Sequence, residues 1–224
     1  MSHSEISPSI FYWGTPVVLI TTENEDGTYN IGPMSSAWWI GTSCMLGLEH
    51  TSQTTINLLR TKQCVLNLPS DDMTSAVNAL ARTTGTPEVP AGKFARGYRH
   101  EKDKFGIAGL TPEPSTLVRP SRIKECPVQM EAELHVTHNI LTHVLEPEHG
   151  VPLALEVKVL KTYVIDELRL PGHTNRIDPD KWKPMIMMFQ HLYGLKGGML
   201  AESTLAGVEE ELYRMPATKS AWAV

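Results

Sequence analysis

The stretch that decides the fold is Gly27–Pro69, which reads GTYNIGPMSSAWWIGTSCMLGLEHTSQTTINLLRTKQCVLNLP. Its apolar and β-branched runs at Thr28–Ile40, Cys44–His50 and Cys64–Pro69 predict three strands. The segment Thr51–Leu59 between the last two runs predicts a short helix. The stretch therefore predicts strand, strand, helix and strand in that order.

Hydroxyl side chains crowd the first turn of this predicted helix, where Thr51, Ser52 and Thr54 follow His50. The first backbone N–H groups of a helix lack intrahelical partners and the helix dipole is positive there, so such a turn can bind a phosphate. Ser and Thr are also ordinary N-cap residues at a helix that binds nothing. These residues by themselves leave both interpretations open.

Length, charge and cysteine content narrow the class of protein. A chain of 224 residues can form one domain with a substantial core. Its three cysteines have no Cys-x-x-Cys spacing, which predicts no disulfide framework and no thiolate zinc site and favours a reducing compartment. No signal-peptide pattern and no apolar run of membrane-spanning length is present, so we expect a soluble cytoplasmic protein without a membrane partner. A net charge of −5 with scattered Lys and Arg argues against a nucleic-acid partner.

Further elements are predicted on both sides of the central stretch. The run Pro16–Thr22 and the turn residues Asn24–Gly27 predict a hairpin. The other predicted elements are strands at Cys126–Ile140 and Val151–Ile165, and helices at Met73–Arg82, Asp178–Tyr193 and Leu205–Arg214.

Helices interspersed irregularly among the strands disfavour a doubly wound parallel sheet and favour a mainly β fold, a closed antiparallel barrel with appended helices. The segment Thr83–Arg122 is rich in Gly, Pro and charge and predicts a long surface excursion with one short helix near Lys102–Gly106. Loops of this length commonly serve a site or a partner. Strict alternation over Val128–Val136 predicts a strand with one face exposed.

Two kinds of chemistry are disfavoured by spacing. His135 and His138 lie three residues apart on a predicted strand, so they point to opposite faces and cannot share a metal ion. We therefore expect no metal site. No serine lies in a nucleophile-elbow pattern. Cys44 and Cys64 lie within apolar runs and are expected to be inert core residues.

Several segments together resemble the flavin reductase-like family, whose members have an FMN-binding split β-barrel and include flavoredoxins and the reductase components of two-component monooxygenases. The resemblance runs from about Thr15 to Tyr193. It is carried by Pro16–Thr22, Asn30 with Met34–Trp38, Thr54–Leu58, Cys64–Pro69, and Asp103–Thr111 followed by Glu125–Val128 and Glu131.

The resemblance implies one split-barrel domain of Greek-key type over residues 1–224, with a C-terminal helical extension from about residue 194 that the shared pattern does not explain. It also implies a homodimer with FMN in a groove near the subunit interface. The residues implied to bind the cofactor are Met34, Ser35, Ser36, Ala37 and Trp38 along the isoalloxazine and ribityl chain, His50, Thr51, Ser52 and Thr54 at the phosphate, and Asn57 on the same helix.

Two functions stay open at this point. The first is an FMN-dependent oxidoreductase that uses NAD(P)H as a transient electron donor, with a partner monooxygenase or another electron acceptor. The second is an FMN-binding electron carrier without nicotinamide oxidation of its own, because the Gly-Asp-His that many short flavin reductases carry is absent at Leu155–Val159. A third interpretation is a barrel that only mediates assembly. No catalytic residue is identified from the sequence.

Overall fold

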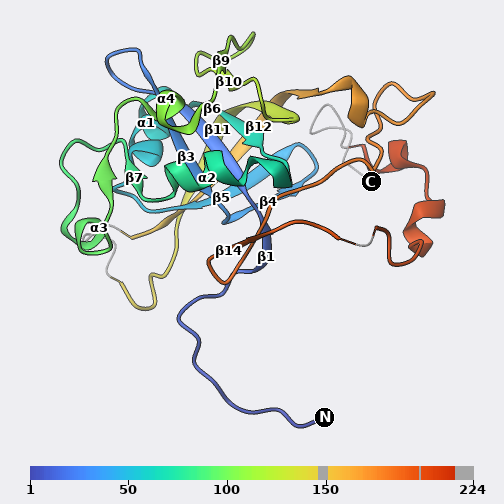
Figure 1. Cartoon of the computed structure of the whole chain (residues 1–224), viewed down its shortest axis with the longest axis horizontal. Coiled ribbons are helices and arrows are strands. Elements are labelled where there is room, and N and C mark those ends of the chain that lie inside the picture. The colour runs from blue at the N-terminus through green and yellow to red at the C-terminus, as the bar shows by residue number, and fades with distance from the viewer. Residues whose placement is uncertain (146–150, 197, 215–224) are drawn as a thin grey trace.

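The computed structural model describes residues 1–145, 151–196 and 198–214, and its centre is one curled antiparallel sheet (Figure 1). The strand order in this seven-stranded sheet is β3-β2-β6-β11-β12-β5-β4. The strands are β2 (Val18–Glu23), β3 (Tyr29–Met34), β4 (Ala37–Ile40), β5 (Ser43–Leu48), β6 (Gln63–Leu68), β11 (Val128–Asn139) and β12 (Leu153–Val164). The predicted strands are thus confirmed, except that the run Thr28–Ile40 is divided into β3 and β4.

The two edges of this sheet meet at one point. β3 and β4 lie at opposite ends of the strand order, yet only Ser35 and Ser36 separate them along the chain. Because consecutive Cα atoms are about 3.8 Å apart, the edges must come together there. The sheet therefore curls back on itself, but its edge strands are not paired with each other, which leaves the barrel split.

The strand connections follow a Greek-key pattern. β5 lies beside β12, whereas the chain leads from β5 through the helix α1 (Gln53–Thr61) to β6, on the far side of β11. The four strands β5, β6, β11 and β12 thus lie in the spatial order β6-β11-β12-β5, so the first of them lies beside the last, which is the Greek-key arrangement. The expected mainly β, Greek-key fold is confirmed.

Two apolar cores lie on the two sides of β2, which explains its continuous apolar sequence. Val18 and Ile20 face the interior of the barrel with residues of β5, β6, β11 and β12. Leu19 faces the other way and packs under α2 (Thr74–Ala81) and α4 (Lys104–Ala108). Figure 1 shows these two helices on one outer side of the sheet.

The predicted excursion Thr83–Arg122 has more structure than one short helix. Besides α4 it contains α3 (Ala91–Ala95) and two small strand pairs, in which β7 (Thr83–Thr84) pairs with β8 (Arg99–His100) and β9 (Pro112–Glu113) pairs with β10 (Arg122–Ile123). The excursion thus forms a cover over one end and one face of the barrel.

The prediction that β11 has one exposed face is wrong for its first half. Gln129 and Glu131 are buried, because β10 covers Gln129 and the loop between β9 and β10 covers Glu131. Glu131 accepts hydrogen bonds from the backbone N–H groups of Thr116 (2.8 Å) and Leu117 (2.6 Å) and from the Tyr163 hydroxyl (2.7 Å). Alternation with exposed residues holds only beyond this point.

The predicted helix Asp178–Tyr193 is also wrong. Its second half is a hairpin of β13 (Ile186–Met188) and β14 (His191–Tyr193), and β13 pairs with β1 (Trp13–Pro16) in a separate three-stranded sheet. Pro184 would interrupt a helix here. Phe189 and Gln190 both have positive φ, as the type I′ turn of a two-residue hairpin requires.

The expected C-terminal helix Leu205–Arg214 consists of two 3-10 turns, η4 (Thr204–Gly207) and η5 (Glu210–Tyr213). Residues 215–224 of the expected extension lie outside the described residues. Two further 3-10 turns are η1 (Asp71–Met73), directly before α2, and η3 (Asp166–Leu168). The predicted helix Met73–Arg82 is confirmed as α2.

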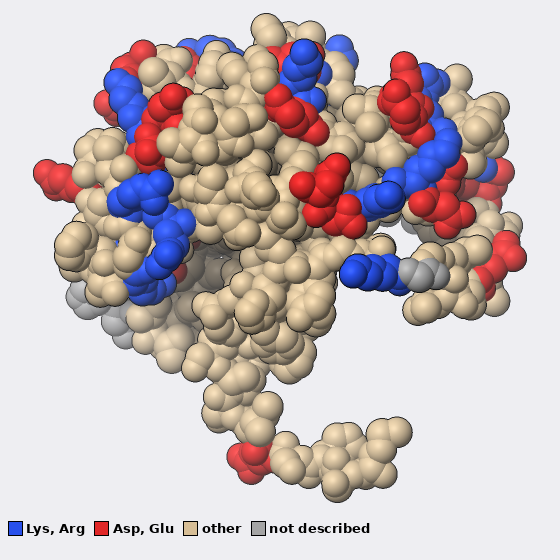
Figure 2. All heavy atoms as spheres, in the orientation of Figure 1, with Lys and Arg blue, Asp and Glu red and all other residues tan. Residues whose placement is uncertain are grey.

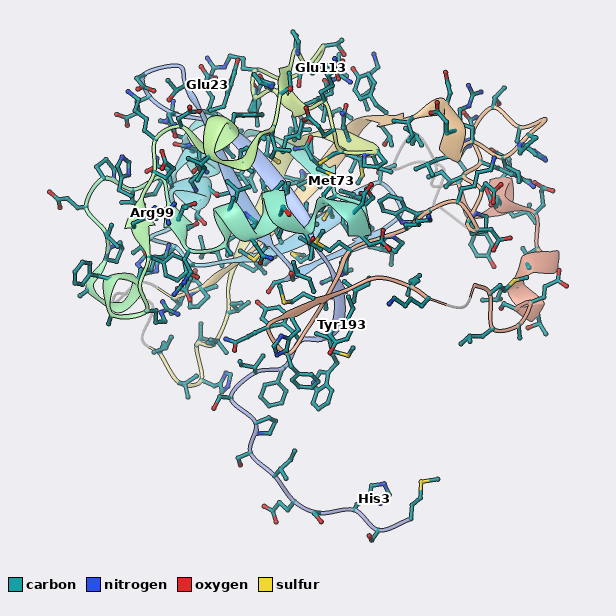
Figure 3. The ribbon with its side chains drawn as sticks, viewed as in Figure 1. His3, Glu23, Met73, Arg99, Glu113 and Tyr193 are labelled. Atoms are coloured by element: carbon teal, nitrogen blue, oxygen red, sulfur yellow. The ribbon has the colours of Figure 1, made fainter. Side chains whose placement is uncertain are left out.

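The three cysteines are free and buried, which confirms the expected core position of Cys44 and Cys64. Burial raises the pKa of the Cys44 thiol to about 12. Within residues 1–145, 151–196 and 198–214 no helix is long and apolar enough to cross a membrane, and no group of three or more His, Cys, Asp or Glu side chains is placed to hold a metal ion. At the N-terminus the segment bearing His3 extends away from the body of the protein (Figure 3).

Candidate functional site

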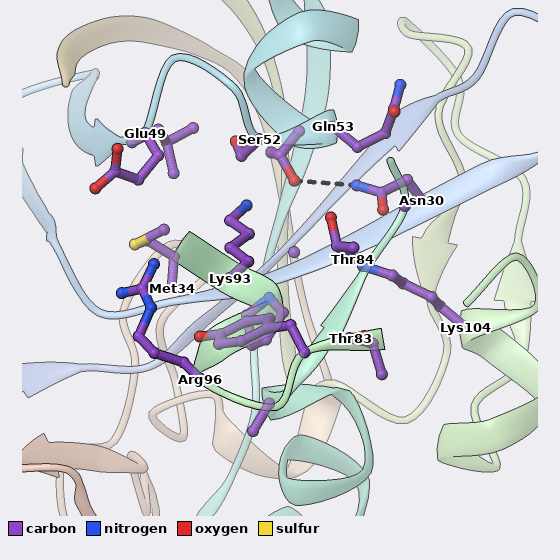
Figure 4. A pocket seen from close by; sticks show the side chains of 17 residues that line it. Asn30, Met34, Glu49, Ser52, Gln53, Thr83, Thr84, Lys93, Arg96 and Lys104 are labelled. Carbon is purple, nitrogen blue, oxygen red and sulfur yellow. Dashed lines mark hydrogen bonds between the residues drawn. The ribbon is translucent and has the colours of Figure 1, made fainter. Parts of the chain in front are cut away.

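A cavity of about 160 Å³ lies at the first turn of α1 (Figure 4). Its walls come from β3, from the end of β5, from α1 and from the excursion that carries β7, α3 and α4. Segments far apart in the sequence therefore meet around the first turn of α1, for which the sequence left phosphate binding and simple N-capping open.

Positive charge is concentrated in this cavity. Lys93, Arg96 and Lys104 line it, and none of them forms an ion pair within the part of the chain that the structure describes. Glu49 supplies the one carboxylate in the lining. Figure 2 shows basic side chains gathered on the side of the molecule where Figure 1 places α3 and β7. The cavity is therefore suited to an anion.

Lys104 is the most buried of these cations, with an exposed fraction of 3%. Its Nζ donates a hydrogen bond to the carbonyl oxygen of Ile31 at 2.8 Å. Burial, which penalises the charged form, and the nearby charge of Lys93 lower the pKa of Lys104 to about 7, while Glu101 opposes this shift. Burial also lowers the pKa of Lys93. An anion in the cavity would favour the charged form of both lysines and so raise their pKa.

The start of α1 offers hydrogen-bond donors to the same space. The amides of Gln53 and Thr54 are the first of the helix, where no intrahelical partner exists. Thr54 Oγ1 accepts from Asn30 Nδ2 at 3.0 Å, the dashed line in Figure 4. Its own hydroxyl hydrogen is left to donate. Thr54 lines the cavity and can thus donate this hydrogen to a bound group.

Ser52 has a different set of bonds. It is the N-cap of α1, and its Oγ accepts from the Thr55 amide at 3.2 Å. Thr55 Oγ1 donates to the Glu49 carbonyl at 2.8 Å, so the 2.8 Å contact between the two hydroxyls is a bond donated by Ser52. Both roles of the Ser52 hydroxyl are used inside the turn. The capping interpretation therefore applies to Ser52, whereas the Thr54 hydroxyl keeps a hydrogen that it can donate.

The remaining residues of the sequence prediction differ in their position relative to this cavity. Met34 lines it, while Ser35, Ser36 and Ala37 continue from Met34 across the gap between the sheet edges. Ser36 Oγ is hydrogen-bonded to the Tyr12 hydroxyl at 2.9 Å.

Trp38, on β4, is 54% exposed, whereas Trp39 is partly buried against the barrel core. The two adjacent tryptophans therefore differ in exposure, as the strand prediction required.

His50 and Thr51 precede α1 in the chain and do not line the cavity. Asn57 lies one turn further along α1 and also stays outside the lining. Its amide donates to Thr22 Oγ1 at 3.1 Å and to Asn24 Oδ1 at 2.8 Å, which anchors α1 on β2. The cavity thus brings together Met34, Ser52 and Thr54 of the predicted set.

Sequence reasoning missed the three cations. Two features of the sequence could have indicated them. The long excursion Thr83–Arg122, which carries all three, was expected to serve a site or a partner. Lys104 also lies within Asp103–Thr111, one of the segments that carry the family resemblance. Asp103 is the N-cap of α4 and accepts from the Gly106 amide at 2.9 Å. This cap starts the helix where Lys104 can reach β3.

Comparison with known proteins places the chain in a family. Residues 12–146 match the model of the flavin reductase like domain. The uncharacterized protein YdfE of Bacillus subtilis (strain 168) is 41% identical over 192 residues, which cover 85% of this chain and 88% of that protein.

Solved structures show the same fold. Flavoredoxin of Desulfovibrio vulgaris (Miyazaki F) has a TM-score of 0.71 at 21% identity, with 92% of this chain and 100% of that chain covered. Nitrilotriacetate monooxygenase component B from Bacillus cereus has a TM-score of 0.69 at 17% identity, with 89% and 98% covered. The curled seven-stranded sheet described above is thus the split-barrel fold that these proteins share. The chain belongs to the flavin reductase like family.

Proposed function

We propose that this protein is an FMN-binding oxidoreductase and that the cavity at the start of α1 holds the phosphate of FMN. The observation that carries this proposal is the set of three cations, Lys93, Arg96 and Lys104, without a carboxylate partner in the described structure. Free helix-start amides and uncompensated cations together match a phosphate dianion in both charge and hydrogen bonding.

The phosphate would be held by the Thr54 hydroxyl and by the amides of Gln53 and Thr54, with the cations balancing its charge. Ser52 and Asn57 would not contact the phosphate but would position the residues that do. The hydrogen bond of Ser52 fixes the first turn of α1, and that of Asn57 fixes the position of α1 on β2. His50 and Thr51 adjoin this turn and would limit access to it.

The flavin ring would extend from the cavity toward the gap between the sheet edges. Met34 lines the cavity and the chain continues from it through Ser35, Ser36, Ala37 and Trp38 along that gap. Backbone groups in this segment would contact the isoalloxazine. When bound, the isoalloxazine supplies the electron transfer, and the protein sets its access and orientation.

For the electron donor we favour NAD(P)H, used transiently, with a partner monooxygenase or another acceptor receiving the electrons. The structural likeness to nitrilotriacetate monooxygenase component B supports this choice. The second candidate is an electron carrier without nicotinamide oxidation. It is favoured by the likeness to flavoredoxin and by the absence of Gly-Asp-His in Leu155–Val159.

We further propose a homodimer in the cytoplasm. Phe11, Trp13, Trp38 and Ile40 are each more than half exposed, and aromatic side chains of this size commonly cover a partner. A second copy of the chain would shield them. Three free cysteines suit a reducing compartment.

Two measurements test the function. Fluorescence titration should give one tightly bound FMN per chain and weaker riboflavin binding, because riboflavin lacks the phosphate. Stopped-flow mixing of the FMN-loaded protein with NADH and with NADPH should bleach the flavin absorbance if the protein oxidises nicotinamide. No bleaching with either donor, together with reduction by dithionite, would leave the carrier function. Failure to bind any flavin would overturn the proposal as a whole.

A further inference from the structure

We propose that a wall made by Asn30, Gln53 and Gly85 makes this chain select a flavin mononucleotide over a flavin dinucleotide. The inference rests on the proposed function, because it takes the phosphate of the ligand to lie at the start of α1. It adds the residues that decide how many phosphates the ligand can carry.

The wall separates two cavities. The first is the cavity at the start of α1, and the second, of about 400 Å³, lies beyond it between the turn that follows β2 and the excursion around β8. Asn30, Gln53 and Gly85 line both cavities, so they form the partition. A ligand extended beyond its first phosphate in this direction would have to pass between them.

Hydrogen bonds hold this partition in place. Asn30 Nδ2 donates to Thr54 Oγ1 at 3.0 Å, and Gln53 Nε2 donates to Asn57 Oδ1 at 2.9 Å. The backbone of Gly85 packs tightly against both side chains, since a Cβ atom at this position would lie 2.5 Å from Asn30 Oδ1 and 2.9 Å from Gln53 Cγ. Asn30 is buried. The partition is therefore tightly packed, and a pyrophosphate that crossed it would have to displace these side chains.

The charge reverses across the wall. The cavity at the start of α1 has three cations and one carboxylate. The second cavity has three carboxylates, Glu25, Asp26 and Glu101, against Lys102 and His100. Lys102 is paired with Asp26 at 2.9 Å, which leaves the other two carboxylates without an ion pair in the described residues. A second phosphate would meet like charge there, which disfavours binding.

The test compares FAD with FMN in the full-length protein by fluorescence titration. We expect the parent protein to bind FMN at least about 100-fold more tightly than FAD, because juxtaposed like charges cost several kcal/mol. The double variant Gln53→Ala, Glu101→Gln opens the wall and removes one carboxylate. Its ratio of FAD to FMN dissociation constants should fall by about tenfold or more.

Two further variants keep the test decisive. Glu101→Gln alone changes charge without touching α1 and should lower the ratio by a smaller factor. Glu88→Gln removes an exposed carboxylate of the same excursion that lines neither cavity and should leave the ratio at its parental value. If the parent binds FAD and FMN equally, or if both Glu101 variants keep the parental ratio of dissociation constants, the proposed selection by the wall is wrong while flavin binding itself stands. Absence of all flavin binding overturns both.

Discussion

Lys104 Nζ donates to the carbonyl oxygen of Ile31 across 2.8 Å, which ties the first residue of α4 to the edge strand β3. The ammonium group is almost fully buried and has no ion-pair partner within the described chain. Folding therefore brings a positive charge into a place that penalises it, and the proposed ligand supplies the missing negative charge.

The stability of the ligand-free protein should depend on pH through Lys104. Its pKa is lowered from 10.5 to about 7, so between these values the unfolded state binds more protons than the folded state. The free energy of unfolding should therefore rise with pH from about 7 to about 10.5. Lys104→Met should flatten this rise, whereas Lys124→Met, at an exposed position, should keep it. Urea unfolding at several pH values measures the difference, and parallel curves for all three proteins would contradict it.

FMN affinity should have the opposite dependence on pH. An anion next to Lys104 favours its charged form, so binding takes up a proton when the pH is above about 7. Affinity should then fall as the pH rises, by at most about tenfold per pH unit for one proton. Calorimetry in buffers of different ionisation enthalpy detects the proton uptake. The same uptake in Lys104→Met would assign it to another group.

Thr54 and Ser52 should separate phosphate binding from capping. Thr54→Val keeps the shape of the side chain and removes a hydrogen bond to a charged acceptor, worth about 1.5–3 kcal/mol. FMN affinity should fall about tenfold or more, while riboflavin affinity stays nearly unchanged. Ser52→Ala should instead lower the free energy of unfolding by about 0.5–2 kcal/mol and affect both flavins alike. Titration and thermal melts of both variants test this, and equal losses for the two flavins in Thr54→Val would sink the phosphate assignment.

Glu131 should stabilise the fold without taking part in flavin binding. Burial raises its pKa, but hydrogen bonds from the Thr116 amide, the Tyr163 hydroxyl and the Leu117 amide together lower it below the usual value. Its contribution to stability is therefore fully present above the unfolded pKa of about 4.5 and is lost as the pH falls through the lower folded pKa.

Glu131→Gln should lower the free energy of unfolding at pH 7 by about 1–3 kcal/mol, because its two carboxylate oxygens each accept one backbone amide and the variant replaces one oxygen by an NH₂ group that cannot accept. Glu133→Gln, on the exposed part of the same strand, is the matched control and should change it little. Chemical denaturation measures both. A Glu131→Gln protein as stable as the parent would show that the loop between β9 and β10 does not depend on this carboxylate.

Trp38 should support the proposed dimer. Sedimentation at micromolar concentration should give a dimer for the parent protein. Trp38→Glu should weaken dimerisation by about thirtyfold or more, since a central tryptophan at an interface is commonly worth 2 kcal/mol or more. Leu212→Glu, at a residue of η5 with an exposed fraction of 77%, should leave the dimer intact. A parent protein that sediments as a monomer with flavin bound would refute the dimer.

Local patterns in the sequence were enough for the central elements and for the start of α1. Alternating and β-branched runs predicted β2, β3, β5, β6 and β12, and the hydroxyl cluster at Thr51–Thr54 predicted the start of α1. These features depend on residues close together in the chain, where burial on a pleated strand and the unpaired amides of a first turn act directly.

Long-range contacts decided the rest. The segment at Ile186–Tyr193 has helical spacing of apolar residues, yet pairing of β13 with β1 makes it a hairpin. Glu131 alternates as an exposed residue would, yet the loop after β9 buries it. The charge of the cavity has the same origin, because Lys93 and Lys104 reach the start of α1 only when the excursion folds over β3. Strand pairing, burial and charge decide these three features. Each of these energies arises between residues that are far apart in the sequence.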